Sequence, residues 1–216
     1  MTGYFICIVG IDGSGKTTLA NRTIKTFSDR LSLKYIYCGW RQFDSFIFRY
    51  IVKVLKKFRS TKSLNAYKFT TRIPKTRNKE LFKFFVLTDY YITIISRLTV
   101  PLIFGTNIIS DRYFYDVFIN TGLDLKESNN EIMASISKWS HLFPKPDIIF
   151  LIDVPVEISY LRKNDIPYKN YLSKHRKLFQ DISKSYDVVL LDGTLPLEKL
   201  EKLIQDELET FLRCKI

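Results

Sequence analysis

Five short, mostly apolar runs recur along the chain, and each is followed by a glycine or by polar residues. They are Tyr4–Val9, Lys34–Cys38, Asn107–Ser110, Asp147–Ile152 and Asp187–Leu191. Within them the apolar residues are consecutive rather than alternating. This pattern predicts strands that are buried on both faces, as in a parallel sheet.

Segments with helical patterns lie between these runs. The pattern predicts helices over Lys16–Asp29, Phe43–Phe58, Lys79 to about Leu98, and Leu197–Leu212. Ser60–Arg77 is polar, basic and interrupted by a proline, which predicts a loop. Because strands and helices alternate, we expect an α/β fold in which helices cover both faces of a doubly wound parallel sheet.

Composition limits the class of protein. The chain has 216 residues, a length typical of one domain, and its 46% hydrophobic residues exclude a disordered or fibrous protein. Three cysteines with no repeated spacing and a start unlike a signal peptide indicate the cytoplasm. The apolar stretch Tyr90–Ile109 contains Arg97, Pro101 and Gly105. We therefore expect a buried helix, a turn and a strand there, and no membrane partner.

Positive charge is concentrated in one part of the chain. The net charge is +12, and Arg49–Lys79 holds eleven basic residues and no acidic one. This basic segment, part of a helical and loop region at 43–79, would raise the local concentration of phosphate-bearing molecules. An equally simple interpretation is a solvated surface helix followed by a loop.

The strongest motif is Gly-Ile-Asp-Gly-Ser-Gly-Lys-Thr at positions 10–17, between a predicted strand and a predicted helix. It matches the phosphate-binding P-loop pattern, whose backbone amides and helix N-terminus bind the phosphates of a nucleoside triphosphate. Lys16 would reach the β- and γ-phosphates, and Thr17 would bind Mg²⁺. The predicted nucleotide-binding residues of this loop are Gly10, Ile11, Asp12, Gly13, Ser14, Gly15, Lys16, Thr17 and Thr18.

The acidic residues at strand ends favour transfer over hydrolysis. Asp111 is followed by Arg112 and Asp153 by Val154, so neither has the neighbouring glutamate that a hydrolytic motor uses to activate water. The only Asn-Lys pair, at Asn78, lacks the following residues that a GTPase needs to read its base. Phosphoryl transfer to a bound acceptor is therefore the favoured chemistry.

Asp111 and Arg112 come at the end of the third predicted strand, where open α/β sheets bind ligands. Asp111 can hold Mg²⁺, and Arg112 can bind an acceptor phosphate with two hydrogen bonds. The alternative is that Asp111 caps the next helix and Arg112 is a surface residue.

With these motifs the chain resembles the thymidylate kinase family of nucleoside monophosphate kinases. The resemblance rests on GIDGSGKTT, SDRY, PDIIFLIDVPVEISYLRK and VVLLDGT, spread over nearly the whole chain. It implies ATP and Mg²⁺ as cofactors, a single P-loop kinase domain over residues 1–216 with five parallel strands, and commonly a homodimer.

The resemblance also implies roles for particular residues. Asp12 would lie near the acceptor and the metal, and Arg112, in the Asp-Arg-Tyr motif with Tyr113, would bind the acceptor phosphate. A short lid near 162–168 would begin at Arg162 and Lys163, with Arg162 closing over the transferred group. The loop that starts at Asp192 would contact the adenine.

The acceptor side departs from the family pattern. The family's Arg-Glu-Pro turn is replaced by Gly39-Trp40-Arg41, and the arginine expected in the long helix by Tyr90. After the Asp-Arg-Tyr motif, the small residues and the Tyr-Gln pair that complete the base pocket in the family are replaced by Asp116, Val117, Asn120 and Thr121. Phe82, Phe85 and Asp89 share a face of the long helix, where core packing is as plausible as base stacking. The candidate acceptor contacts are Asp12, Trp40, Phe85, Asp89, Arg112 and Tyr113.

Three functions follow from these observations. The first is an ATP-dependent kinase for a nucleoside monophosphate, with dTMP as the leading acceptor. The second is a P-loop kinase for another phosphorylated small molecule, and the third a nucleic-acid-binding nucleotide switch that uses the basic segment. Nucleic acid is the less favoured partner, because the chain has no known nucleic-acid-binding motif. His141 and His175 lie apart from any cysteine cluster, and we expect neither to bind a metal.

Overall fold

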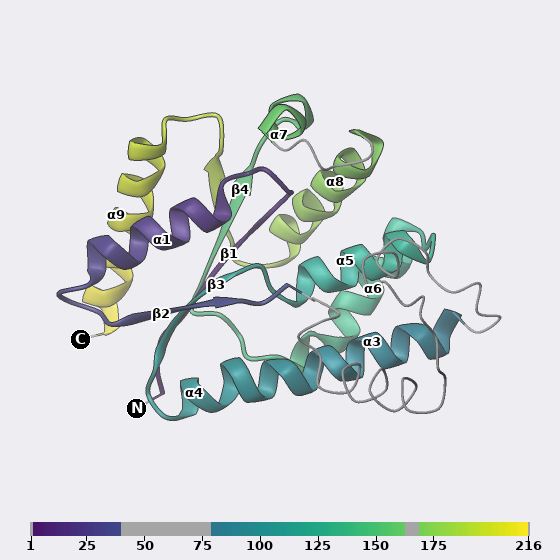
Figure 1. The fold of residues 1–216 in the computed structure, drawn as a ribbon, viewed down its shortest axis with the longest axis horizontal. Coiled ribbons are helices and arrows are strands. Elements are labelled where there is room, and N and C mark those ends of the chain that lie inside the picture. Colours follow the sequence, from purple (N-terminus) through teal and green to yellow (C-terminus); the bar gives the residue numbers. More distant parts are fainter. Residues whose placement is uncertain (1, 40–78, 163–168, 216) are drawn as a thin grey trace, which may run out of the picture.

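The computed structural model describes residues 2–39, 79–162 and 169–215. In this part of the chain five parallel strands form one sheet (Figure 1). They are β1 Phe5–Gly10, β2 Leu33–Tyr37, β3 Asn107–Asp111, β4 Ile148–Asp153 and β5 Val189–Asp192. Each begins and ends within two residues of the predicted strand, so the predicted five-stranded α/β fold is confirmed.

The strand order is β2-β3-β1-β4-β5, which puts the first strand at the centre. In register, Phe5 of β1 pairs with Ile108 of β3, and Ile6 pairs with Ile148 of β4. The connection after β1 leads to one side of the sheet, and the connection after β3 leads to the other. The carboxyl ends of β1 and β3 therefore flank the switch point, where open α/β sheets bind their ligands.

Helices cover both faces of the sheet. They are α1 Lys16–Phe27, α3 Lys79–Ile94, α4 Val100–Ile103, α5 Phe114–Asp124, α6 Asn129–Trp139, α7 Val156–Arg162, α8 Lys169–Ser185 and α9 Leu197–Lys215. A turn of 3-10 helix, Ser140–Leu142, follows α6. Helices α1 and α9 lie together on one side of the sheet, and α3, α5 and α6 lie on the other (Figure 1).

Successive residues of β1 enter opposite layers of the core. Phe5, Cys7 and Val9 pack with residues of α3, α5, α6 and α8, whereas Ile6 and Ile8 pack with α1 and α9. A strand whose residues are buried on both faces must be apolar at every position, because side chains alternate between the faces. The continuous apolar runs in the sequence have this cause.

A π-helical turn, Ile95–Thr99, joins α3 to α4 without a break. Pro101 lies in the first turn of α4, where its missing N–H is tolerated. The segment Lys83–Ile103 has the length and apolar composition of a membrane span, with a mean hydropathy of 1.3. One face of it, which includes Val86 and Ile94, lies in the core cluster beside the sheet. The prediction of a buried helix is right for this face and wrong for the other, where Ile92 and Ile103 are exposed.

Other predictions differ from the structure or lie outside it. The sequence patterns did not predict the helices α5 to α8. The predicted helix Phe43–Phe58, the predicted loop Ser60–Arg77, most of the basic segment and the lid residues 163–168 lie outside the described residues. The single-domain prediction for residues 1–216 stays a prediction.

Candidate active site

The phosphate loop runs from the end of β1 into α1, as predicted, and its glycines adopt conformations with positive φ. These angles are 143° at Gly10, 79° at Gly13 and 96° at Gly15. A β-carbon on Gly10 would lie 2.6 Å from the carbonyl oxygen of Ile152, and one on Gly13 would lie 2.7 Å from that of Ser159. Larger residues at Gly10 and Gly13 would therefore be strained and would collide with neighbouring backbone.

The side chain of Lys16 is buried inside this loop. Its Nζ donates to the carbonyl oxygens of Gly10 and Ile11, at 2.9 and 2.7 Å, and to Ser14 Oγ at 3.3 Å. Burial, followed by the nearby charge of Arg112, lowers the pKa of Lys16 to about 8. Because an anion beside Nζ would favour the charged form, phosphate binding and protonation of Lys16 reinforce each other.

Asp111 lies at the end of β3, and one of its carboxylate oxygens accepts two hydrogen bonds. The hydroxyl of Thr17 donates to Oδ2, and so does that of Tyr35 at 3.0 Å. The other oxygen, Oδ1, is buried and has no hydrogen-bond partner among the described residues. Magnesium in phosphoryl-transfer sites typically takes one carboxylate or hydroxyl ligand together with phosphate oxygens and water. A buried carboxylate oxygen beside the Thr17 hydroxyl fits that requirement.

Arg112 is held between two carboxylates. Its backbone has a φ of 72°, and its amide donates to Ile8 O at 2.9 Å. Its Nη1 donates to Asp116 Oδ1 at 2.8 Å, and its Nη2 donates to Asp12 Oδ1. Burial lowers the pKa of Arg112, but the carboxylates of Asp116 and Asp12 outweigh it and raise the pKa above its ordinary value. The side chain is only 14% exposed, so the alternative of a surface residue is wrong.

Asp116 is the partner that sequence reasoning did not assign to Arg112. It is fully buried in the first turn of α5, and it also accepts a hydrogen bond from the amide of Tyr113 at 3.3 Å. Burial raises the pKa of Asp116 despite the neighbouring guanidinium. The spacing of four residues between Arg112 and Asp116 could have indicated the ion pair, but only if the start of α5 at Phe114 had been known.

The base of the lid is bonded to the phosphate loop. Ser159 on α7 donates its hydroxyl hydrogen to the carbonyl oxygen of Asp12. At the end of α7, Arg162 donates through both Nη1 and Nη2 to the carbonyl oxygen of Gly193, each at 3.3 Å. The structure thus brings Arg162 to the loop predicted to contact adenine. Lys163, the other basic residue predicted at the lid, lies outside the described residues.

Two further strand-end acids already have partners. Asp192 accepts from the amide and the hydroxyl of Thr194, at 2.9 and 2.7 Å. Asp153 is bound by Arg176 of α8 through two hydrogen bonds of 2.6 and 2.9 Å. This arginine lowers the pKa of Asp153. The ion pair joins α8 to the end of β4 on the nucleotide side of the sheet.

The predicted acceptor contacts fall in different places. Trp40 and the side chain of Phe82 lie outside the described residues. Phe85 is 53% exposed, so the alternative of Phe85 as a core residue is wrong. Asp89, one turn later on the same side of α3, is buried. Tyr113 lies in the core, and its hydroxyl donates to Pro144 O at 2.6 Å.

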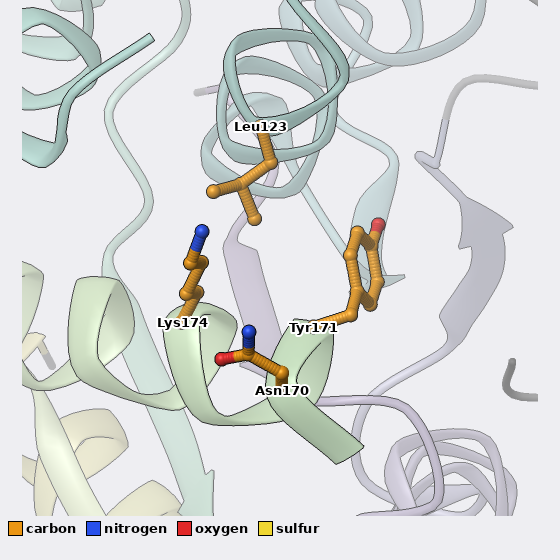
Figure 2. A pocket seen from close by; sticks show the side chains of 4 residues that line it. All are labelled: Leu123, Asn170, Tyr171 and Lys174. Atoms are coloured by element: carbon orange, nitrogen blue, oxygen red, sulfur yellow. The ribbon is translucent and has the colours of Figure 1, made fainter. Parts of the chain in front are cut away.

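A pocket opens between the end of α5 and the first turns of α8 (Figure 2). It is lined by Leu123 from α5 and by Asn170, Tyr171 and Lys174 from α8. The hydroxyl of Tyr171 donates to Asn120 Oδ1 at 2.6 Å. Asn120 stands where the family pattern has a residue of the base pocket, so this pocket adjoins the predicted acceptor side of the site.

Comparison with known proteins gives a consistent set of relatives, although no protein-family model matches the chain. A probable thymidylate kinase of Metallosphaera sedula is 30% identical over 208 residues, which cover 92% of this chain and 88% of the relative. A probable thymidylate kinase of Archaeoglobus fulgidus is 28% identical over 97% of both chains. A thymidylate kinase of Sulfurihydrogenibium sp. is 26% identical, covering 96% of this chain and 97% of the relative. The similarity spans both the phosphate loop and the acceptor side.

Proposed function

Since the chain belongs to the thymidylate kinase family, and is thus a phosphotransferase, we propose that it transfers the γ-phosphoryl group of ATP to a nucleoside monophosphate. The expected acceptor is dTMP and the expected product is dTDP. The observation that carries this proposal is the position of Arg112, held between Asp12 and Asp116 beside the phosphate loop. A buried, oriented guanidinium next to a triphosphate site suits an acceptor that itself carries a phosphate.

On the donor side, the backbone of residues 10–17 and the N-terminus of α1 would bind the triphosphate. Lys16 would stabilise the charge that develops on the β- and γ-phosphates. Thr17 and Asp111 would hold Mg²⁺, which supplies positive charge at the phosphate oxygens. The predicted contact of the Asp192 loop with adenine is part of this proposal.

On the acceptor side, Arg112 would orient the monophosphate so that one of its oxygens faces the γ-phosphorus. No general base is needed, since the attacking oxygen is already an anion at neutral pH. Asp12 would stay beside the acceptor and keep the guanidinium in place. Phe85 and Asp89 on α3, and Trp40, remain candidate contacts for the nucleoside. Tyr113 would act through the core, by fixing the start of α5.

Closure over the reacting groups is assigned to Arg162. In the described structure this arginine binds Gly193 O, so it would have to leave that carbonyl to reach the transferred phosphoryl group. The hydrogen bond from Ser159 of α7 to Asp12 O would let a change at the nucleotide reach the base of the lid.

The assembly we propose is a homodimer in the cytoplasm. The side of the helix α3–α4 opposite the core exposes Ile92, Ile95 and Ile103, with Phe104 just beyond it. An apolar stripe of this kind suits a second copy of the chain. Ile103→Asp should shift the sedimenting species from dimer to monomer, and an unchanged sedimentation profile for a folded variant would contradict this surface. The three cysteines are free, as expected in a reducing compartment.

A coupled assay of ADP release tests the proposed reaction with each common nucleoside monophosphate as acceptor. We expect turnover that depends on the acceptor and is highest with dTMP. Absence of acceptor-dependent turnover with all of them would contradict the proposal.

The second candidate, a P-loop kinase for another phosphorylated small molecule, is favoured by one observation. A fully buried aspartate, Asp116, occupies a position where the family pattern expects a small residue. Thermal unfolding with dTMP and with other phosphorylated metabolites separates the two candidates. A ligand at a hundred times its dissociation constant stabilises the folded state by about 2.7 kcal/mol. No stabilisation by dTMP, beside a clear effect of another metabolite, would favour this second candidate.

A further inference from the structure

Asp116 is a buried carboxylate that binds the guanidinium of Arg112 from the inner side of the fold. Its Oδ1 accepts from Arg112 Nη1 at 2.8 Å, and its Oδ2 accepts from the backbone amide of Tyr113 at 3.3 Å. The second bond ties the carboxylate to the start of α5. Because a buried carboxylate without partners is costly, the charge of Asp116 depends on this arginine. The two bonds give Asp116 a fixed orientation from which it holds the guanidinium.

The two carboxylates that bind Arg112 differ in exposure. The side chain of Asp116 is 1% exposed, whereas that of Asp12, which accepts from Nη2, is 28% exposed. A ligand can therefore approach the guanidinium only from the side of the phosphate loop. An arginine has five N–H donors, and these two bonds use one on each terminal nitrogen. Within the described part of the chain, the other three are left for a ligand.

The rest of Arg112 is also built around one orientation. Its backbone lies in the left-handed region, with a φ of 72°, and its amide donates to Ile8 O. A β-carbon on Gly39 would lie 2.8 Å from Arg112 Cδ, so the glycine leaves room for the stem of the side chain. An arginine keeps such a backbone conformation only where its surroundings hold it. The fold therefore accepts a local cost to place this one side chain.

The acceptor side of this chain gives that placement added weight. Tyr90 occupies the position of the arginine that the family pattern has in the long helix. It is buried, and its hydroxyl donates to Cys38 O at 2.9 Å, so it supplies no positive charge to an acceptor. At position 116 the chain has a carboxylate where the family pattern has a small residue. With one cation fewer on the acceptor side, more of the binding falls to Arg112.

We propose that Asp116 is a positioning residue, which holds Arg112 in the orientation that receives the acceptor phosphate. This role rests on the proposed function, because it requires an acceptor that carries a phosphate. Asp116 itself touches no substrate and moves no proton. A guanidinium that is already oriented binds the phosphate without first losing its own freedom, and a small displacement of such a group slows transfer markedly.

Kinetics of the acceptor in Asp116→Asn give the first test. Asparagine keeps the size of the side chain but has a single oxygen, so it cannot accept from both Arg112 and the amide of Tyr113. We expect kcat/KM for the acceptor to fall by about 10- to 100-fold, with ATP affinity within a few-fold of wild type. Wild-type acceptor kinetics in folded Asp116→Asn would overturn the proposal.

Asp147→Asn is the matched control. Asp147 directly precedes β4, at the end of the sheet away from the phosphate loop, and its Oδ2 accepts from the amide of Phe5 at 2.8 Å. This substitution also removes a carboxylate that binds a backbone amide. We expect it to leave the acceptor kinetics unchanged, even where the melting temperature falls.

The same substitution in the Arg112→Lys background separates positioning from a merely structural role. If Asp116 acts through Arg112, little is left to lose once the guanidinium is gone. We therefore expect Asp116→Asn to lower kcat/KM by less than about threefold in that background. An equal loss in both backgrounds would overturn the proposal, because independent effects add. Should Asp116→Asn not fold, Asp116→Ser carries the same expectations, since serine is a small residue that also removes the carboxylate.

Binding of inorganic phosphate tests the role without any turnover. A non-hydrolysable imido analogue of ATP with Mg²⁺ fills the donor site, and phosphate is then followed by ³¹P nuclear magnetic resonance. We expect Asp116→Asn to weaken phosphate binding at least about tenfold and Asp147→Asn to leave it unchanged. If this holds while wild type phosphorylates no nucleoside monophosphate, the acceptor assignment fails and the role of Asp116 stands. If wild type turns over dTMP while Asp116→Asn changes neither kinetics nor phosphate affinity, only the role of Asp116 fails.

Discussion

Ser159 donates its hydroxyl hydrogen to the main-chain oxygen of Asp12, which bonds helix α7 to the phosphate loop. Gly13 lies against the same serine, because a β-carbon at this position would lie 2.7 Å from Ser159 O. No side chain fits there. The loop that binds the nucleotide and the helix that precedes the lid are therefore one packed unit.

Ser159→Ala should weaken this unit. The substitution leaves the partly buried carbonyl oxygen of Asp12 without its donor, a change that costs about 1 kcal/mol. We expect a lower free energy of unfolding and several-fold weaker ATP binding, measured by urea titration and calorimetry. Ser185→Ala, which removes an exposed hydroxyl bonded to Asp181 O, is the control and should change neither. Unaltered ATP affinity in Ser159→Ala would show that the bond between α7 and the phosphate loop does not contribute to nucleotide binding.

Lys16→Ala should abolish phosphoryl transfer to every acceptor. The charge removed lies inside the phosphate loop, where its contribution to the transition state amounts to several kcal/mol. The measurement is ADP release at saturating ATP and acceptor, with circular dichroism to verify the fold. Lys25→Ala, on an exposed position of α1, should keep wild-type turnover. Residual activity above about a tenth of wild type would contradict the role assigned to Lys16.

Arg112→Lys should affect the acceptor and spare ATP. Lysine keeps one charge but cannot donate to Asp12 and Asp116 at once while also binding a phosphate with two hydrogen bonds. We expect ATP affinity within a few-fold of wild type, a higher KM for the acceptor and a lower kcat. Arg22→Lys is the control, because Arg22 forms its ion pair with Glu201 at the surface between α1 and α9. Unchanged acceptor kinetics would remove Arg112 from the site.

Asp111→Asn tests the proposed metal ligand. Asparagine keeps one oxygen to accept from Thr17 and Tyr35, but its amide nitrogen cannot bind a cation. We expect the Mg²⁺ concentration for half-maximal activity to rise at least about tenfold. Binding of ATP measured without Mg²⁺ should stay near wild type. Asp29→Asn, at an exposed position, is the control, and equal Mg²⁺ dependence in both variants would exclude Asp111 as a ligand.

The buried imidazole of His175 on α8 predicts a dependence of stability on pH. Burial lowers the pKa of His175 to about 3 in the folded protein, whereas an unfolded histidine has a pKa of about 6.5. Below pH 6.5 the unfolded state binds a proton that the folded state does not, so stability falls as pH falls. From pH 7 to pH 5 wild type should lose about 2 kcal/mol more than His175→Leu. Parallel curves of unfolding free energy against pH for the two proteins would contradict this burial.

The sequence predicted the central parts of this fold because they depend on local constraints. A buried strand must be apolar at each position, and a phosphate loop needs glycine where φ is positive, as at Gly13 and Gly15. Both features can be seen in a few consecutive residues. The positions of Lys16 and Asp111 at the switch point follow from the alternation of strands and helices.

What the sequence did not predict depends on contacts between distant residues. The burial of Tyr113 and the exposure of Phe85 are set by what covers each face of α3 and α5, which no local pattern records. Arg176 binds Asp153 from a helix that begins 16 residues later in the chain. The π-helical turn Ile95–Thr99, just before Pro101, has no signature in the local sequence pattern.

The central place of β1 bears on the order in which the protein can fold. This strand is made before its neighbours β3 and β4, which begin only at Asn107 and Ile148. Contacts between residues so far apart in sequence form slowly, because a long loop must close before they contribute any stability. During synthesis the phosphate loop therefore cannot reach its final shape until β4 has been made. Binding of ATP then stabilises a chain that is already largely folded, and it cannot guide the earlier steps of folding.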